Sequence, residues 1–438
     1  MTIDVVNAAE SVAVQSRVAG SLAALGLGPS DRFALSLDGS ALYVSVVLGA
    51  LRVGIVPITL EPRLTPYERD SIIADTTPAL VIDSPAALQS LALGEPVDLS
   101  PYPLARPMHM TSGTTGKPKG VWSGIFDEVA AESLAGEEGE LWGFAPSDRN
   151  LVVSPIYHSA PLRFAMGTLL AGGDVVVMNH FDPAEFVAVV ESKQPTTMFC
   201  VPAHLQRLFA WLDETGRDFD PSSFRIVTHA GAPCPEPIRL RAYDVFGADK
   251  LWEFYGSTEG QFTACPASEW LQHRGTLGRA RPGRTVTADS DGLLWCAVPE
   301  YARFSYWNAP EKTAEAWRET PEGPAFTVGD LGRVEDGYVY LDSRREDLII
   351  TGGVNVYPAE VESALSNADG LREIAVFGIP DDKWGQRVCA AYVGEVDEEA
   401  LRALAAERLA PPKRPKDYVR LNSLPRTATG KIRRTELG

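Results

Sequence analysis

The chain has 438 residues, of which 45% are hydrophobic and 22% are charged, and its formal net charge is −18. Because this length exceeds the size at which a single core normally keeps growing, we expect two or more domains. The acidic charge disfavours a general nucleic-acid binder, which needs a basic face, and the lack of an 18-residue apolar run predicts no membrane span.

The first part of the chain, up to about residue 340, alternates buried strand-like runs with amphipathic helical segments, which is typical of α/β layering. Strands are predicted at 32–37, 79–84, 150–157, 174–179, 196–202 and 225–231. Helices are predicted at 41–54, 161–172, 183–193 and 237–247. Three of these helices end at a glycine, as helices commonly do.

The pattern changes near residue 330 and predicts a smaller α+β unit. Asp336-Gly337 suits a two-residue turn, so 332–343 should form a hairpin. Further on we expect helices at 358–367 and 398–409 and strands at 373–379 and 388–396. With the joint near Ser343 to Asp347, the prediction is a large layered α/β domain over 1–343 and a small mobile domain over 344–438.

The stretch TSGTTGKPKG at 111–120 is polar and rich in glycine. It fits neither the dinucleotide fingerprint GxGxxG nor the GxxxxGK[ST] P-loop. Glycines let backbone N–H groups converge on an anion, while hydroxyls and ammonium groups add donors and charge. The stretch therefore predicts an anion cradle, with a plain surface linker as the alternative. Its candidate ligand-binding residues are Thr111, Ser112, Gly113, Thr114, Thr115, Gly116, Lys117 and Lys119.

This stretch resembles the phosphate loop of the adenylate-forming superfamily, which includes acyl-CoA synthetases, peptide-synthetase adenylation domains and luciferase. Four more segments resemble motifs of that family and occur in its order. They are YGSTE at 255–259, TVGDLG at 327–332, SRREDLIITGGVNVYPAEVE at 343–362 and PRTATGKIRR at 425–434. The resemblance implies the two-domain fold of adenylate-forming enzymes and the use of ATP, Mg²⁺ and CoA.

The resemblance also implies roles at the phosphates. Glu259 would be a Mg²⁺ ligand, because hard oxygen ligands suit that ion, and Thr258 would donate to a phosphate. Gly256 and Ser257 belong to the same nucleotide-binding motif. Lys431 would bridge the attacking carboxylate and the α-phosphate. The alternatives are that Glu259 only begins a helix and that Lys431 is an ordinary tail charge.

Other positions would hold the nucleoside. Tyr255 would pack against the adenine, and Gly231 with Ala232 would leave room for its edge. Asp330 would accept hydrogen bonds from both ribose hydroxyls, with Arg344 assisting. The alternative for Asp330 is a turn residue between two glycines.

A second group of residues would bind the acid. His158 would gate or line the acyl pocket, and the alternative is a structural histidine. The segment 159–164, Ala230 and Gly256 would complete this pocket, which resembles those for apolar aliphatic, aryl or polycyclic acids. Because an arginine pairs well with a second carboxylate, Arg163 keeps a malonate-type acid as an alternative substrate.

In the family the small domain rotates after adenylation about a hinge, which corresponds to Glu346 here, where Asp is commoner. Ser343 replaces the usual Gly and would stiffen the joint. Rotation would bring Gly352 and Gly353 beside the pantetheine tunnel, because glycine permits close backbone approach. Basic residues that could grip the CoA nucleotide are Arg387, Lys413 and Arg414.

The leading hypothesis is a free-standing acid–CoA ligase whose partners are CoA and a small-molecule carboxylic acid. One alternative is an enzyme that loads a carrier protein's phosphopantetheine thiol, and another is a non-catalytic adenylate-binding protein. The scattered cysteines, none in CxxC spacing, and the absence of a signal peptide predict a cytoplasmic protein. The part before residue 111 is shorter than in most members of the family, which leaves a homodimer open.

Overall fold

The computed structural model describes residues 3–112, 118–178, 180–231, 234, 236–343, 349–425 and 434–437. The chain forms two compact units. Unit 1 comprises residues 1–62, 77–109 and 120–342, and unit 2 comprises residues 63–76, 110–119 and 343–438. Within the described ranges, none of the helices combines the length and the apolar character that crossing a bilayer requires.

Unit 1 is built on a ten-stranded sheet whose middle strands are parallel. In spatial order its strands are β1 (Asp4–Val6), β8 (Asp174–Val177), β7 (Arg149–Val152), β9 (Thr197–Cys200), β10 (Ile226–His229), β11 (Leu251–Glu253), β12 (Thr263–Pro266), β13 (Arg279–Ala280), β20 (Tyr338–Ser343) and β19 (Leu331–Glu335). The strands β8, β7, β9 and β10 are fully or almost fully buried, which explains why their sequences read as continuous apolar runs.

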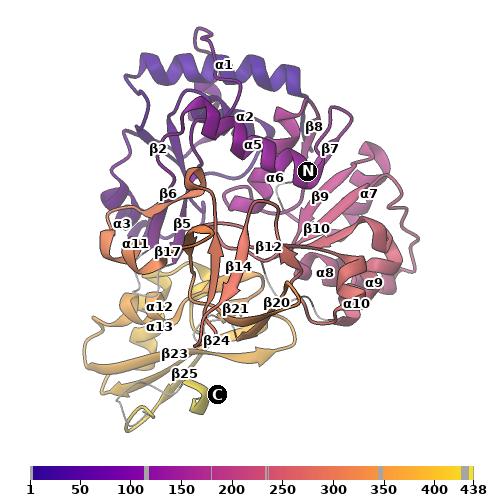
Figure 1. Cartoon of the computed structure of the whole chain (residues 1–438). Coiled ribbons are helices and arrows are strands. Elements are labelled where there is room, and N and C mark those ends of the chain that lie inside the picture. Colours follow the sequence, from indigo (N-terminus) through magenta and orange to yellow (C-terminus); the bar gives the residue numbers. More distant parts are fainter. Residues whose placement is uncertain are drawn as a thin grey trace. The chain divides into compact units, whose positions relative to one another are not determined.

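Helices connect these parallel strands in the order that the alternating sequence pattern predicts. They are α6 (Ser159–Leu170), α7 (Pro183–Lys193), α8 (Pro202–Thr215) and α9 (Glu236–Phe246), and Figure 1 shows α7, α8 and α9 beside β9 and β10. The apolar faces of α7, α8 and α9 and the strands form one large core that includes Phe186, Phe209 and Phe246. This packing fixes the carboxyl ends of the parallel strands at one edge of the sheet.

Two smaller sheets have most of their residues in unit 1. One has the order β16 (Ser305–Tyr306), β6 (Pro118–Trp122), β5 (Met108–Ser112), β3 (Val56–Thr59), β2 (Arg32–Leu35) and β4 (Leu80–Ile82). The other has the order β14 (Thr285–Ala288), β15 (Leu294–Ala297), β18 (Gly323–Phe326) and β17 (Trp317–Thr320). The remaining helices of unit 1 are α1 (Ala8–Ala24), α2 (Ala41–Leu51), α4 (Pro85–Leu91), α5 (Glu128–Trp142), α10 (Ala267–Gln272) and α11 (Pro310–Ala316).

Unit 2 is a small sheet with helices, and a segment from early in the chain belongs to it. The sheet contains β22 (Val354–Val356), β21 (Ile349–Thr351), β24 (Gly385–Gly394), β23 (Leu371–Asp381) and β25 (Asp417–Arg420). The helices are α3 (Pro66–Thr76), α12 (Pro358–Leu365) and α13 (Glu398–Arg408). Because Glu68 on α3 and Glu360 on α12 both pair with Lys413, α3 is tied into this unit.

The predicted elements form with shifted ends. The strand expected at 150–157 ends at Val152, because residues after it turn toward α6 and Pro155 has no N–H for a sheet. The Asp336-Gly337 turn is confirmed between β19 and β20, with φ of 51° and 81°. The mixed α/β fold class with a separate C-terminal unit is confirmed as well.

Candidate nucleotide and acid site

Three predicted site residues follow three strands of the ten-stranded sheet. His158 comes after β7, Gly231 after β10 and Tyr255 after β11. Neighbouring strands from β7 through β9 and β10 to β11 are parallel, so their carboxyl ends share one edge. Ligands of such open α/β sheets bind at this edge. The sheet therefore brings together predicted residues that lie far apart in the sequence.

Tyr255 and Asp330 are joined by a hydrogen bond. The Tyr255 hydroxyl donates to Asp330 Oδ2 over 2.5 Å, and the Tyr255 ring packs on Phe262. Asp330 follows Gly329, whose φ of 82° turns the chain between β18 and β19. The phenol therefore aligns one oxygen of the Asp330 carboxylate. A carboxylate fixed in this way suits hydroxyl donors such as those of a ribose.

Glu259 is buried, and its carboxylate lies within a polar shell. Its Oε1 accepts a hydrogen bond from the Tyr306 hydroxyl at 2.8 Å, and its main-chain oxygen accepts one from Arg106 Nη1 at 3.3 Å. The neighbouring Ser257 Oγ is buried and has no hydrogen-bond partner within the described part of the chain. Thr258 is partly buried in the same loop. A hydroxyl of this kind can donate to a phosphate oxygen, and a carboxylate of this kind can bind the Mg²⁺ that accompanies a phosphate.

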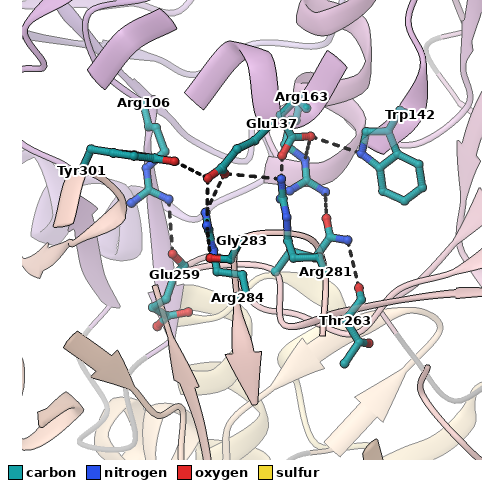
Figure 2. A network of polar contacts seen from close by, with 12 residues as sticks. Arg106, Glu137, Trp142, Arg163, Glu259, Thr263, Arg281, Gly283, Arg284 and Tyr301 are labelled. Carbon is teal, nitrogen blue, oxygen red and sulfur yellow. Dashed lines mark hydrogen bonds and ion pairs between the residues drawn. The ribbon is translucent and has the colours of Figure 1, made fainter. Parts of the chain in front are cut away.

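Beside Glu259 lies a buried network of arginines and glutamates, shown in Figure 2. Glu137 and Glu138 project from α5. Glu137 pairs with Arg284 at 2.7 Å, and Glu138 pairs with Arg281 at 2.7 Å and with Arg163 Nε at 3.4 Å. The Arg163 guanidinium also donates to Gln261 Oε1 at 2.9 Å, just after the Glu259 loop. The network thus connects α5 and α6 to that loop.

The network shifts the acid–base behaviour of its members. Burial alone would raise the pKa of Glu138, but the charges of Arg163 and Arg281 outweigh it and lower that pKa. Burial, reinforced by the charges of Arg284 and Arg163, lowers the pKa of Arg106 to about 10. Arg106 therefore stays cationic at neutral pH.

His158 precedes α6 and is exposed. It occupies the N-cap position of α6, but its side chain makes no cap hydrogen bond to the helix, and its ring lies 4.6 Å from the Tyr157 ring. Nearby residues of the predicted acyl pocket belong to a buried group that we call the aromatic cluster. It consists of Trp142, Phe164, Phe199, Ile226, Ala230 and Phe254.

Unit 2 carries the residues predicted to meet CoA and part of the polar loop. Gly352 and Gly353 form the two-residue turn between β21 and β22, with φ of 58° and 82°, and both are exposed. Thr111 Oγ1 donates to the Lys119 main-chain oxygen over 3.4 Å, across β5 and β6.

Several predicted residues fall outside the described part of the chain. These are Gly113, Thr114, Thr115, Gly116, Lys117, Ala232, Arg344, Glu346 and Lys431, together with the side chain of Ser112. The CoA-binding candidates are engaged elsewhere. Lys413 is buried between Glu68 and Glu360, Arg414 donates to main-chain oxygens, and Arg387 pairs with Asp417 at 2.9 Å.

Sequence reasoning missed Arg106, Tyr306 and the acidic pair on α5. Arg106 has no motif around it, and it becomes notable only when its buried surroundings are known. The run EEGE at 137–140 and the pair Arg281 and Arg284 were visible as complementary charges. Their distance along the chain gave no reason to pair them.

Comparisons with known proteins agree with this geometry. The model of the AMP-binding enzyme family matches residues 10–101 and 108–292, and the model of the AMP-binding enzyme C-terminal domain matches residues 360–431. The chain is 29% identical to the long-chain-fatty-acid–CoA ligase FadD13 of Mycobacterium tuberculosis, over 98% of this chain and 92% of that protein.

Two further proteins are similar over nearly their whole length. The chain is 30% identical to the fatty acid–[acyl-carrier-protein] ligase ScoC of Streptomyces coeruleorubidus, over 96% of this chain and 89% of that protein. The solved structure of o-succinylbenzoate CoA synthetase (MenE) from Bacillus subtilis, bound to a product analogue, aligns with a TM-score of 0.86 and 27% identity. That alignment covers 98% of this chain and 92% of the MenE chain.

Proposed function

The chain belongs to the AMP-binding enzyme family, and from this premise we propose that it is an AMP-forming acid–CoA ligase. In the first step the carboxylate of an acid attacks the α-phosphorus of ATP. An acyl–oxygen–phosphorus bond forms and the bond to pyrophosphate breaks. In the second step the CoA thiol attacks the acyl carbon, a thioester forms, the thiol proton is released and AMP leaves.

The observation that carries the proposal is the placement of Tyr255, Asp330 and Glu259 at the carboxyl edge of the parallel strands. Tyr255 holds one oxygen of Asp330, which leaves the carboxylate oriented to accept ribose hydroxyls. Gly231, whose φ is 86°, follows β10 at the same edge and leaves space that a side chain would occupy. These features suit the nucleoside of ATP.

Glu259 fits a magnesium ion by its chemistry, because it is a buried carboxylate with one oxygen held by Tyr306. When bound, Mg²⁺ would neutralise charge on the phosphates and assist the departure of pyrophosphate. Thr258 and Ser257 supply hydroxyl donors beside the carboxylate, and the buried Ser257 Oγ has a hydrogen bond to give. Lys431 would add a positive charge at the attacking carboxylate.

The aromatic cluster favours an acid with an apolar body, whether aliphatic, aryl or polycyclic. Phe164 comes from α6, Phe199 from β9, and Phe254 directly precedes the Tyr255 loop, so the cluster adjoins the proposed nucleotide site. Aromatic surfaces of this size contribute strongly to the binding of apolar ligands. His158, exposed at the start of α6, would face the entrance to this region.

A carrier protein is the second candidate for the thiol acceptor. CoA and an acyl-carrier protein present the same phosphopantetheine thiol, and the similarity to ScoC, a ligase named for a carrier protein, supports this alternative. In either case Gly352 and Gly353 would pass close to the pantetheine chain, because an exposed turn of two glycines permits close backbone approach.

The proposal is tested by pyrophosphate release over a panel of carboxylic acids, with CoA, with a carrier protein, and with neither. Lys431→Ala is the inactive variant, and Lys416→Ala controls for the loss of a lysine in the same unit. We expect release to require both the acid and Lys431, and acyl-CoA to accumulate when CoA is present.

Other outcomes separate the alternatives. Thioester on the carrier protein but not on CoA would favour the second candidate. An adenylate that forms equally in Lys431→Ala would remove the assigned role of that lysine. No release with any acid, while ATP still binds, would favour a non-catalytic adenylate-binding protein.

A further inference from the structure

Arg106 has two buried hydrogen-bond donors without partners. It precedes β5, and its Nη1 donates to the Glu259 main-chain oxygen at 3.3 Å. Its Nε and Nη2 are buried, and within the described residues neither has a hydrogen-bond partner. No other described arginine leaves more than one buried nitrogen without a hydrogen bond. Burying unpaired donors of a charged group is costly, so these two nitrogens indicate that a ligand supplies the partner.

The two unpaired nitrogens form one edge of the guanidinium. Nε–H and Nη2–H point in the same direction and can bind two oxygens of one carboxylate or of one phosphate. Arg225 uses this edge elsewhere in unit 1, where its Nε and Nη2 hold the two oxygens of Asp148 at 2.7 and 2.6 Å. The edge of Arg106 therefore suits an anion with at least two oxygens, and its position in the site decides between the two anions.

Arg106 lies at the phosphate end of the proposed site. Its guanidinium contacts the main chain of Glu259, the proposed magnesium ligand, and Figure 2 shows the guanidinium directed at that residue. The Mg²⁺ that accompanies a nucleoside triphosphate bridges oxygens of the β- and γ-phosphates. The anion next to Arg106 should therefore be the pyrophosphate half of ATP, that is, its β- and γ-phosphates.

The charges around Arg106 favour an anion that carries more than one negative charge. Glu259 offsets the charge of Arg106 while no ligand is bound. The adjoining network of described residues has three guanidinium groups and two carboxylates, and thus one positive charge in excess. These groups belong to Arg163, Arg281, Arg284, Glu137 and Glu138. Once Glu259 holds Mg²⁺, its charge is shared with the metal, and the β- and γ-phosphates supply the negative charge that the site then lacks.

We propose that Arg106 binds the pyrophosphate half of ATP, with Nε and Nη2 donating to two oxygens of one phosphate group. This inference rests on the proposed ligase function. When the bond between the α-phosphorus and pyrophosphate breaks, its electron pair stays on pyrophosphate, and Arg106 keeps its proton. A guanidinium already in place stabilises the charge that accumulates on this leaving group. Because both nitrogens are buried, water screens their charge little.

The test compares ligands with and without the pyrophosphate half. ATP and AMP, each with Mg²⁺ and without acid, are titrated calorimetrically into the wild type, Arg106→Met, Arg106→Lys and the control Arg241→Met. AMP shares the nucleoside and the α-phosphate with ATP but lacks the β- and γ-phosphates. Arg241 makes a bidentate bond to the carboxylate of Asp213, but on the exposed surface of unit 1.

We expect Arg106→Met to bind ATP on the order of 100-fold more weakly, because one partner of a buried charged pair is lost, and to bind AMP as the wild type does. Arg106→Lys should recover part of the ATP affinity, since it keeps the charge but not the two parallel bonds. With an acid that supports turnover, kcat for pyrophosphate release should fall in Arg106→Met on the order of 100-fold. Arg241→Met should match the wild type in every measurement.

Two results would overturn the inference. An equal loss of ATP and AMP affinity in an Arg106→Met variant that is folded by circular dichroism would show that Arg106 only positions the Glu259 loop. An unchanged ATP affinity in Arg106→Met would show that its free edge binds no phosphate. Failure of the ligase proposal is distinct, because it would appear as no pyrophosphate release with any acid. The ATP and AMP titrations would then still decide the role of Arg106, and a wild type that binds neither nucleotide would overturn both proposals.

Discussion

The Tyr255 hydroxyl orients Asp330 before any nucleotide binds, because their hydrogen bond of 2.5 Å joins the end of β11 to the loop before β19. In Tyr255→Phe the ring and its packing on Phe262 persist while this bond is lost. We expect the KM for ATP to rise by about tenfold or more, since a hydrogen bond to a charged group contributes about 1.5–3 kcal/mol. Steady-state kinetics at saturating acid measure this change.

Tyr301→Phe is the matched control for this substitution. It removes a hydroxyl–carboxylate bond of the same length, to Glu137, without touching Asp330. An unchanged KM for ATP in Tyr255→Phe, or an equal rise in both variants, would contradict the assigned role of the Tyr255–Asp330 pair.

Tyr306 has the corresponding role at Glu259. Its hydroxyl holds Glu259 Oε1 at 2.8 Å, so Tyr306→Phe releases one oxygen of the proposed metal ligand. We expect the Mg²⁺ concentration for half-maximal activity to rise about tenfold or more, because loss of a group that orients a metal ligand typically weakens metal binding by that factor. The measurement is a Mg²⁺ titration of pyrophosphate release at constant ATP. A shifted ATP dependence with an unchanged Mg²⁺ dependence would argue against Glu259 as the ligand.

At this scale the sequence predicted residues with a motif and missed residues without one. Tyr255, Glu259 and Asp330 lie in short segments with a recognisable pattern, and the fold places Tyr255 on Asp330. Tyr306 and Arg106 reach the same loop from other elements. Their roles depend on tertiary contacts, which no local pattern in this sequence encodes.

The helix α5 shows how an element can be held mainly by charge. Asp127 caps its first turn by accepting from the Ala130 N–H, and Gly143 ends it in the left-handed region at φ 60°. Only Ala131, near its start, and Trp142, at its end, are fully buried along it, so apolar packing holds the two ends. Glu137 and Glu138 fix the rest of the helix to Arg284, Arg281 and Arg163.

Glu138→Gln should therefore destabilise unit 1 strongly. Arg163 and Arg281 would lose their main partner while still buried, and breaking such a pair costs about 3 kcal/mol. Urea unfolding followed by tryptophan fluorescence measures this, since Trp384 is the one tryptophan outside unit 1 and the other eight of nine report on that unit. The control is Asp213→Asn, which breaks the exposed pair with Arg241 and should lower the free energy of unfolding by less than about 1 kcal/mol.

The ion pairs of Glu138 also determine how the stability of unit 1 changes as the pH falls. Because the native pKa of Glu138 is lowered, its contribution to stability is present above the ordinary glutamate pKa and is lost as pH falls through the native value. Wild type should therefore lose stability on acidification more steeply than Glu138→Gln. Parallel acid profiles would show that folding does not lower the pKa of Glu138.

The sequence predicted those elements whose burial gives them a recognisable apolar pattern. The strands β7 to β10 are buried along almost their whole length and were predicted, whereas α5 has few fully buried residues and was not. The association of α3 with the C-terminal elements also left no local signal. It depends on Glu68 and Lys413, which are 345 residues apart.

At the scale of the whole molecule, the proposed reaction divides between the two units. The residues assigned to the nucleotide and the acid, apart from the polar loop, Arg344 and Lys431, lie in unit 1, and the glycine turn assigned to pantetheine lies in unit 2. The two half-reactions should therefore respond differently to a change in that turn. The chain supplies a matched pair of turns for this test, because Gly337 and Gly353 occupy the second position of two-residue turns with φ of 81° and 82°.

Alanine at either glycine should lower the free energy of unfolding by about 1–2 kcal/mol, since a residue with a Cβ is strained in the left-handed region. Only Gly353→Ala should also slow thioester formation from a synthetic acyl-adenylate, by at least tenfold, because an added methyl group would displace the pantetheine chain by about 1 Å. Pyrophosphate release should be retained in both variants. Equal rates of thioester formation in Gly353→Ala and Gly337→Ala would place the pantetheine path away from this turn. A loss of pyrophosphate release in Gly353→Ala would instead assign the turn to adenylation.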